Sequence, residues 1–258
     1  MIGQGLQVSL LRVPLNASPW TLRGHLYTAL ARRFCRSPGD ACPACKLFNP
    51  TYLRRDGKAR DEVRPVVIRQ AGEHSEILLF GRATEYGADI QRALPASGFW
   101  VGPDGQQHPA PVVSPLSDWI QPVQGAVLLR FLSPLRLEKA GSIQADFSLD
   151  ALVRSLSLRL HRLRASVGDG VWDDPEVDQA TRDAQTVTVS AFCLWREVAR
   201  RYSSRQHRTV WLDGLVGWAR LENVRPSLGR LLAAGRVLHA GKGAVFGCGW
   251  LEATQVSP

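Results

Sequence analysis

The chain has 258 residues, enough for one large domain or two small ones, and 45% of them are hydrophobic, as in a globular protein with a packed core. Its formal net charge is +9, and 28 of its 32 basic residues are arginine because lysine occurs at only four positions. The planar guanidinium of arginine binds phosphate with two hydrogen bonds and stacks on bases, so this excess of arginine favours a nucleic-acid partner. Codon bias in a GC-rich genome is an alternative explanation for the ratio of arginine to lysine, but not for the net charge.

Nothing in the sequence predicts secretion or membrane insertion. The residues after Met1 lack the positively charged segment and the following apolar stretch of a secretory signal peptide. No apolar run approaches the roughly 20 residues that span a bilayer. The five cysteines are unevenly placed, which argues against a disulfide framework. We therefore expect a cytoplasmic protein with no membrane partner.

The first 34 residues predict a strand followed by a long helix. The apolar run from Leu6 to Val13 favours a strand. Ser18-Pro19 marks a helix start, with serine as the cap and proline at the first helical position. We expect the helix to end near Phe34 and to bury residues that recur at helical spacing. These are Leu22, Leu26, Ala29, Leu30 and Phe34.

A polar and basic loop over residues 35–61 carries three cysteines, and short elements follow it. We expect strands at residues 64–69, 76–83 and 99–101 and a short helix at residues 85–94. Proline, glycine and serine are frequent over residues 103–122, which predicts a linker or a long loop.

The second half repeats this order of elements. We expect strands at residues 126–132, 209–212, 216–221 and 244–252, and helices at residues 149–165, 175–202 and 227–234. Asp213-Gly214 is a hairpin signal between two of these strands. Each half thus reads strand, helix, strand, strand, helix, strand. The prediction is an α+β chain of two tandem ferredoxin-like (RRM-like) domains, residues 1–122 and 123–258, with a helical insertion in the second at residues 167–186.

The glycine-rich segment from Gly241 to Gly249 does not match either common nucleotide loop. A phosphate-binding loop needs an earlier glycine at fixed spacing and a serine or threonine where Gly243 stands. A dinucleotide fingerprint needs a different glycine spacing and a helix after the loop. Two explanations stay open: a nest of backbone N–H groups that binds phosphate, or a glycine-rich turn with a structural role.

The C-terminal residues, taken together, resemble a known family. Residues 202–217, which contain YSSRQHR and LDGLVG, and the tail HAGKGAVFGCG at residues 239–249 closely resemble the C-terminal domain of the CRISPR-associated repeat endoribonucleases of the RAMP superfamily. Residues 131–137 resemble the opening strand of that domain. Residues 24–34, 42–48 and 64–66 are similar to the first domain of some members, so the resemblance covers nearly the whole chain. The arginine richness and compact size are similar to those of the type IV branch.

This resemblance implies an activity. A member would cut CRISPR precursor RNA at the base of the repeat stem-loop by attack of the ribose 2′-hydroxyl, leaving a 2′,3′-cyclic phosphate, with no metal and no other cofactor. It would stay bound to the crRNA hairpin and join other CRISPR effector subunits. A non-catalytic RNA-binding subunit of an effector complex is the alternative, and a zinc-containing nucleic-acid regulator is a weaker third.

The resemblance places the catalytic residues on the first helix and the loop after it. His25 is the candidate acid or base, since the pKa of histidine lies near neutrality. Arg23 and Lys46 are candidates to stabilise the charge on the phosphate. Tyr27 is a further candidate, although it lies about 200° around the helix from His25. An exposed or capping role is one alternative for His25, and catalysis by an arginine that orients the 2′-hydroxyl and neutralises charge is another.

The candidate RNA-binding residues are basic side chains and glycines, for which a merely solvated surface is the alternative. They are Arg32, Arg33, Arg36, Arg159, Arg162, Arg205, His207, Arg208, His239, Gly241, Lys242, Gly243, Gly247 and Gly249.

Cys35, Cys42 and Cys45 leave two possibilities open. The spacing of the last two suits a metal, but a structural zinc site takes four ligands, and His25 or His74 would have to complete it. Our prediction is reduced cysteines in a buried loop with no metal.

Overall fold

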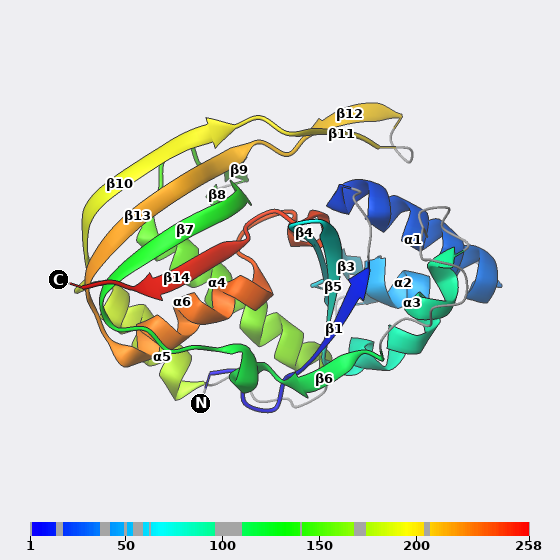
Figure 1. Cartoon of the computed structure of the whole chain (residues 1–258), viewed down its shortest axis with the longest axis horizontal. Coiled ribbons are helices and arrows are strands. Elements are labelled where there is room, and N and C mark those ends of the chain that lie inside the picture. Colours follow the sequence, from blue (N-terminus) through cyan, green and yellow to red (C-terminus); the bar gives the residue numbers. More distant parts are fainter. Residues whose placement is uncertain are drawn as a thin grey trace. The chain divides into compact units, whose positions relative to one another are not determined.

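The computed structural model forms two compact units, each with a four-stranded antiparallel sheet (Figure 1). It describes residues 2–13, 18–36, 42–48, 51–53, 59–61, 63–95, 110–139, 141–167, 174–203 and 207–257. Unit 1 comprises Met1–Gln4, Leu116–His161 and Val171–Pro258, and unit 2 comprises Gly5–Pro115 and Arg162–Gly170. The main division thus falls after Pro115, seven residues before the end of the first domain in our prediction.

Unit 2 has the ferredoxin-like strand order. Its main elements are β1 (Gln7–Val13), α1 (Pro19–Phe34), β4 (Val66–Ala71), β5 (His74–Phe80), α3 (Gly87–Ala93) and β6 (Val112–Pro115). The sheet order β4-β5-β1-β6 places the first and third main strands side by side at the centre. Shorter elements are α2 (Pro43–Phe48), β2 (Thr51–Leu53), β3 (Ala59–Asp61) and the 3₁₀ turn η1 (Gly81–Tyr86).

Helix α1 forms as its sequence predicts. The Ser18 side chain accepts a hydrogen bond from the backbone N–H of Thr21, and Pro19 opens the helix. Leu22, Leu26, Ala29 and Leu30 are buried, so the apolar stripe is the packed face of the helix. The opposite face is left to polar and basic residues.

Unit 1 repeats the same topology with an added helix. Its main elements are β7 (Gly125–Leu135), α4 (Leu149–Val167), α5 (Pro175–Ala184), β10 (Thr188–Glu197), β13 (Gly214–Val224), α6 (Pro226–Leu238) and β14 (Leu251–Gln255). The last residues of α4, from Arg162 on, are counted in unit 2. The sheet order is β10-β13-β7-β14, and the helices lie along one side of it (Figure 1). Helix α5 is the predicted helical insertion. Shorter elements are η3 (Leu116–Trp119), β8 (Glu138–Lys139), β9 (Ser142–Ile143), β11 (Arg200–Ser203), β12 (Arg208–Trp211) and η4 (Ala244–Phe246).

The prediction of one helix over residues 175–202 was wrong. Helix α5 ends at Ala184, and strands β10 and β11 follow it. The segment TVTV at residues 186–189 is β-branched throughout, and such side chains fit a strand better than a helix. Acidic residues at the start of this segment (Glu176 and Asp178) and arginines near its end (Arg196 and Arg200) match the charge gradient of one helix, but they belong to different elements.

Two other predictions near the C-terminus also need correction. Asp213-Gly214 does not close a hairpin, because β12 pairs with β11 while β13 pairs with β10 and β7. The predicted strand over residues 244–252 is the turn η4 followed by β14, since Gly247 and Gly249 take positive φ angles that interrupt an extended chain. The predicted strand at residues 99–101 lies outside the described residues.

The glycine-rich segment is a closed loop fastened to the end of β7. The N–H of Lys242 donates to the carbonyl of Arg136 at 2.9 Å, and the N–H of Gly249 donates to that of Pro134 at 3.0 Å. The N–H of Ala240 donates to the carbonyl of Gly249 at 2.9 Å and so closes the loop on itself. These amides are engaged within the protein, which favours the structural explanation for this part of the loop.

Two glycines are required by this packing. Gly249 has a φ of +73°, and a Cβ there would lie 1.8 Å from the carbonyl oxygen of Ala240. Gly241 has a φ of +76°, and a Cβ there would lie 2.5 Å from the carbonyl oxygen of Arg136. A side chain at Gly241 would therefore push the loop away from Arg136 at the end of β7, and one at Gly249 would disrupt the closure of the loop on itself.

Among the described residues, no helix has both the length and the apolar character needed to cross a membrane.

Substitution of Gly249 by alanine should lower the free energy of unfolding by about 2–5 kcal/mol, because the methyl group meets a backbone oxygen and the φ angle is unfavourable. Urea denaturation of the whole chain measures this change. Gly24→Ala is the matched control, since Gly24 lies inside α1 with no atom within 4 Å of an added Cβ. The control should gain about 0.5–1 kcal/mol from helix propensity. Equal effects of the two substitutions would contradict the packing described here.

Candidate RNA interface and catalytic residues

Arg136 connects the glycine-rich loop to a hairpin that we call the arm, β11 with β12 (residues 200–203 and 208–211). Its guanidinium donates to the carbonyls of Asp213 at 3.1 Å and Trp211 at 3.2 Å, where the arm joins β13. Its own carbonyl accepts the N–H of Lys242. One residue thus ties the end of β7, the loop and the base of the arm together.

A second arginine strengthens the base of the arm. The Nε of Arg196 donates to a carboxylate oxygen of Asp213 at 2.7 Å. This hydrogen bond, which outweighs the effect of partial burial, holds the pKa of Asp213 below its usual range. The Asp213 carboxylate therefore stays charged and bonded at neutral pH.

One face of the arm combines aromatic and basic side chains. The register pairs Arg200 with Trp211 and Tyr202 with Thr209, which puts these four residues on the same face. Tyr202 is 64% exposed and Trp211 is 54% exposed, although both are large aromatic residues. Exposed aromatics beside an arginine are suited to stack on nucleic-acid bases.

The other face of the arm lies against the glycine-rich loop. The Arg201 guanidinium stands over the ring of Phe246, 4.2 Å from its centroid. His207 and Arg208 are exposed where the arm turns, as an RNA-binding role requires. Arg205 lies outside the described residues.

The position of His239 in the structure contradicts its predicted role in RNA binding. The sequence puts it among the RNA-binding candidates, but its side chain is fully buried. Its Nδ1 lies 3.0 Å from the carbonyl oxygen of Cys248, and its ring stacks on Trp250 with centroids 6.3 Å apart. The side chain therefore cannot contact RNA directly and serves as part of the scaffold of the loop.

Burial also raises the pKa of the neighbouring Cys248 thiol to about 11.

The loop exposes one cation. Lys242 is exposed, and its Nζ lies 2.7 Å from a carboxylate oxygen of Glu138. Gly243 is half-buried beside it, while Gly247 is buried. Lys242 is thus the side chain of this loop best placed to bind a phosphate, which would replace the Glu138 carboxylate as its partner.

Two further arginines were predicted on α4. The Nε of Arg159 donates to the carbonyl of Leu238, the last residue of α6. This bond satisfies a helix-end carbonyl, which is a structural role. Arg162 is exposed.

The catalytic candidates of α1 fall on two sides of the helix. Arg23 and Tyr27 both contact Phe48 of α2: the Arg23 guanidinium lies 5.2 Å from the centre of that ring, and the Tyr27 ring meets it edge-on at 6.2 Å. His25 is exposed on another side. The structure therefore brings Arg23 and Tyr27 together and leaves His25 open to an incoming substrate.

The remaining basic candidates of unit 2 are exposed. They are Arg32, Arg33, Arg36 and Lys46. The Arg33 guanidinium lies 5.7 Å from the centre of the neighbouring Phe34 ring. Sequence inspection found these residues but missed Arg200, Tyr202 and Trp211, because the register that brings them together depends on the pairing of β11 with β12.

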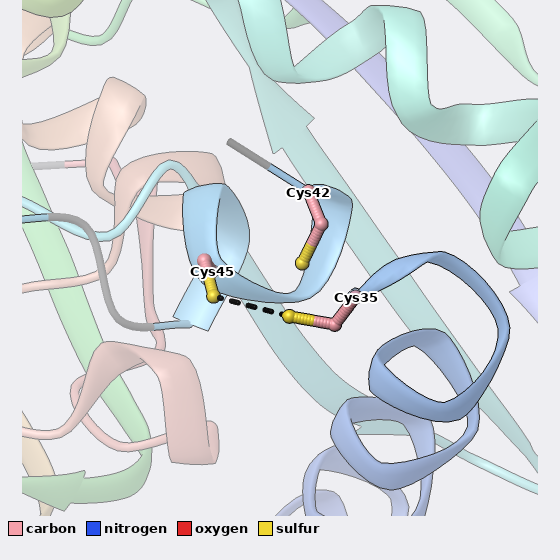
Figure 2. A group of neighbouring side chains, drawn as sticks. All are labelled: Cys35, Cys42 and Cys45. Carbon is pink, nitrogen blue, oxygen red and sulfur yellow. Dashed lines mark hydrogen bonds between the residues drawn. The ribbon is translucent and has the colours of Figure 1, made fainter. Parts of the chain in front are cut away.

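Cys35, Cys42 and Cys45 meet where α1 ends and α2 begins, and Figure 2 shows their sulfur atoms turned toward one another. Burial alone would raise the pKa of Cys42, but hydrogen bonds from the N–H of Cys45, from the neighbouring thiols and from the N–H of Ala44 lower it. The hydrogen bond to Cys42 is the main cause that raises the pKa of Cys35 to about 12.

Comparison with known proteins gives one family and one fold. The family model described as CRISPR-associated endoribonuclease Cas6 matches residues 129–251. Cas6 of Thermus thermophilus has a similar structure, with a TM-score of 0.60 and 16% identity over 96% of this chain and 98% of that one. A product complex of another Cas6 gives a TM-score of 0.58 and 16% identity over 96% of this chain and 99% of that one.

A longer protein contains the same fold. In a partial Cas6-RT-Cas1–Cas2 complex, 98% of this chain aligns with 47% of the matched chain, with a TM-score of 0.56 and 11% identity. A search of curated protein sequences finds no match. None of these matches assigns a branch, so the type IV branch stays a prediction. The family match covers residues 129–251, a little under half of the chain, and the likeness to the Cas6 structures extends the same fold over almost its whole length.

Proposed function

We propose that the chain cuts CRISPR precursor RNA at the base of the repeat stem-loop and stays bound to the crRNA hairpin. The observation that carries this proposal is the match of residues 129–251, which include the arm and the glycine-rich loop, to a family of CRISPR endoribonucleases. The net charge of +9 and the exposed aromatic and basic face of the arm support an RNA partner. Other CRISPR effector subunits are the proposed protein partners.

The proposed reaction is an internal transfer of the phosphate. The ribose 2′-hydroxyl attacks the adjacent phosphorus, the bond to the 5′-oxygen breaks, and the products carry a 2′,3′-cyclic phosphate and a 5′-hydroxyl. The step needs a base, an acid and a cation beside the phosphate, and no part of it requires a metal. His25 suits acid or base work, and Arg23 or Lys46 suits the cation.

Tyr27 has a different proposed role. It shares the Phe48 ring with Arg23, so it is placed to fix the direction of the Arg23 side chain. We treat Tyr27 as a positioning residue, and His25, Arg23 and Lys46 as the candidates for direct contact with the reacting groups.

RNA recognition is proposed to combine shape with stacking. A double-stranded RNA stem hides its major groove, so a protein reads its phosphates and its unpaired flanks. The exposed arginines of α1 and Arg162 suit phosphates, whereas Tyr202 and Trp211 suit stacking on unpaired bases. His207, Arg208 and Lys242 add charge near the arm and the loop.

A non-catalytic RNA-binding subunit is the second candidate. The exposed aromatic and basic face of the arm would serve this role equally well, because RNA binding by stacking and charge needs no acid or base. This candidate would keep the RNA interface and lack cleavage.

The first prediction concerns chemistry. The purified chain should cut a repeat RNA in the presence of EDTA, and a 2′-deoxy substitution at the scissile nucleotide should abolish cutting because it removes the nucleophile. His25→Ala should lower the single-turnover rate about 10²- to 10⁴-fold without weakening RNA binding. His161→Ala is the matched control, since His161 is a half-buried histidine of α4 outside the proposed site. Cleavage of the deoxy substrate would overturn the mechanism, and tight binding without any cleavage would select the second candidate.

The second prediction concerns the arm. Tyr202→Ala and Trp211→Ala should each weaken repeat RNA binding about 5- to 150-fold, as expected for the loss of one stacked base. Filter binding or fluorescence anisotropy at fixed salt measures the affinity. Phe192→Ala is the control, because Phe192 is equally exposed at 66% but lies on β10 outside the arm. Unchanged affinity in both arm variants would remove the arm from the RNA interface.

A further inference from the structure

The three cysteines of unit 2 are arranged as a partial metal-binding site. Their sulfur atoms all lie within 4.8 Å of one another, and the Cys35 and Cys45 sulfurs are 3.9 Å apart (Figure 2). Cys35 is the residue that ends α1, Cys42 stands just before α2, and Cys45 is in its first turn. Two helices that are separate in sequence thus supply one cluster.

We propose that Cys35, Cys42 and Cys45 bind one zinc ion as three of its four ligands, with an oxygen or nitrogen donor as the fourth. The ion would be structural, and the proposed RNA cleavage does not pass through it. The proposal is therefore independent of the proposed function.

The distance between sulfurs fits a metal better than a disulfide. Two thiolates on a tetrahedral zinc ion, each at about 2.3 Å, lie about 3.8 Å apart. The sulfurs of a disulfide lie only about 2.05 Å apart, and none of these three cysteines is in a disulfide. The observed 3.9 Å between Cys35 and Cys45 is already the separation that a shared ion requires, and the Cys42 sulfur lies within 4.8 Å of both.

The backbone around Cys42 is suited to a thiolate ligand. The N–H groups of Ala44 and Cys45 donate hydrogen bonds to the Cys42 sulfur. Donors of this kind orient a metal ligand and offset its negative charge. The Lys46 N–H donates to the Cys42 carbonyl at 3.0 Å, which fixes the turn between the two cysteines.

The chemistry of the ligands selects the metal. Thiolates are soft ligands, and sets of cysteines with a Cys-x-x-Cys spacing favour zinc over magnesium or calcium. Three thiolates exceed the charge of a divalent ion by one and that of a soft monovalent metal by two, so a divalent ion is the better fit.

The proposed ion would fix the pair of helices that carries the catalytic candidates. It would join the end of α1 to the start of α2, while Phe48 at the other end of α2 contacts Arg23 and Tyr27 of α1. The two attachments together would hold α2 along α1.

Metal content tests the proposal. The full chain, purified under reducing conditions, should contain about one zinc per chain by elemental mass spectrometry. Cys42→Ser and Cys45→Ser should each reduce this to less than about a fifth, because two thiolates hold zinc poorly. Cys193→Ser is the matched control, since Cys193 is exposed on β10 of unit 1, and it should keep its zinc.

A spectroscopic measurement on the unaltered chain tests the proposal without any variant, so it does not depend on whether the cysteine variants fold. X-ray absorption at the zinc edge should show about three sulfur neighbours near 2.3 Å and one oxygen or nitrogen neighbour. The proposal is overturned if the reduced chain contains no zinc and takes up none when it is added. Full zinc content in both cysteine variants, or a zinc shell without sulfur, would overturn it equally.

Discussion

The contacts of Arg136 are the constraint on which the arm and the glycine-rich loop of unit 1 depend. Its carbonyl receives an N–H of the glycine-rich loop, and its guanidinium binds two carbonyls at the base of the arm. The loop can approach Arg136 this closely only because Gly241 has no side chain. The glycine-rich loop is therefore first a structural connection between β7 and the arm. Its proposed contribution to RNA binding rests on the elements that it holds in place.

The two units supply different chemical groups. Unit 1 offers an aromatic and basic arm, with Tyr202 and Trp211 exposed at a cost in hydration that a stacked base would recover. Unit 2 offers the histidine and arginine of α1. This division explains why the same ferredoxin-like topology occurs twice with unlike surfaces. The fold positions the elements, and the side chains on them determine the chemistry.

The sequence predicted features that depend on neighbours along the chain. Ser18, Pro19 and the leucine stripe of α1 are a local signal, and the helix formed as expected. The strands after Ala184 were missed because a charge gradient imitated one long helix, and the arm was missed because its register depends on pairing between β11 and β12. The burial of His239 was likewise set by tertiary packing, which no pattern of neighbouring residues records.

The central claim is that this chain cleaves RNA by internal attack of a 2′-hydroxyl. The chemical identity of the new ends tests that claim most directly, and mass spectrometry of the two fragments of a cut repeat RNA determines it. The account predicts a 2′,3′-cyclic phosphate on the upstream fragment and a 5′-hydroxyl on the downstream fragment. A 3′-hydroxyl together with a 5′-phosphate would contradict it, because those ends arise when water is the nucleophile.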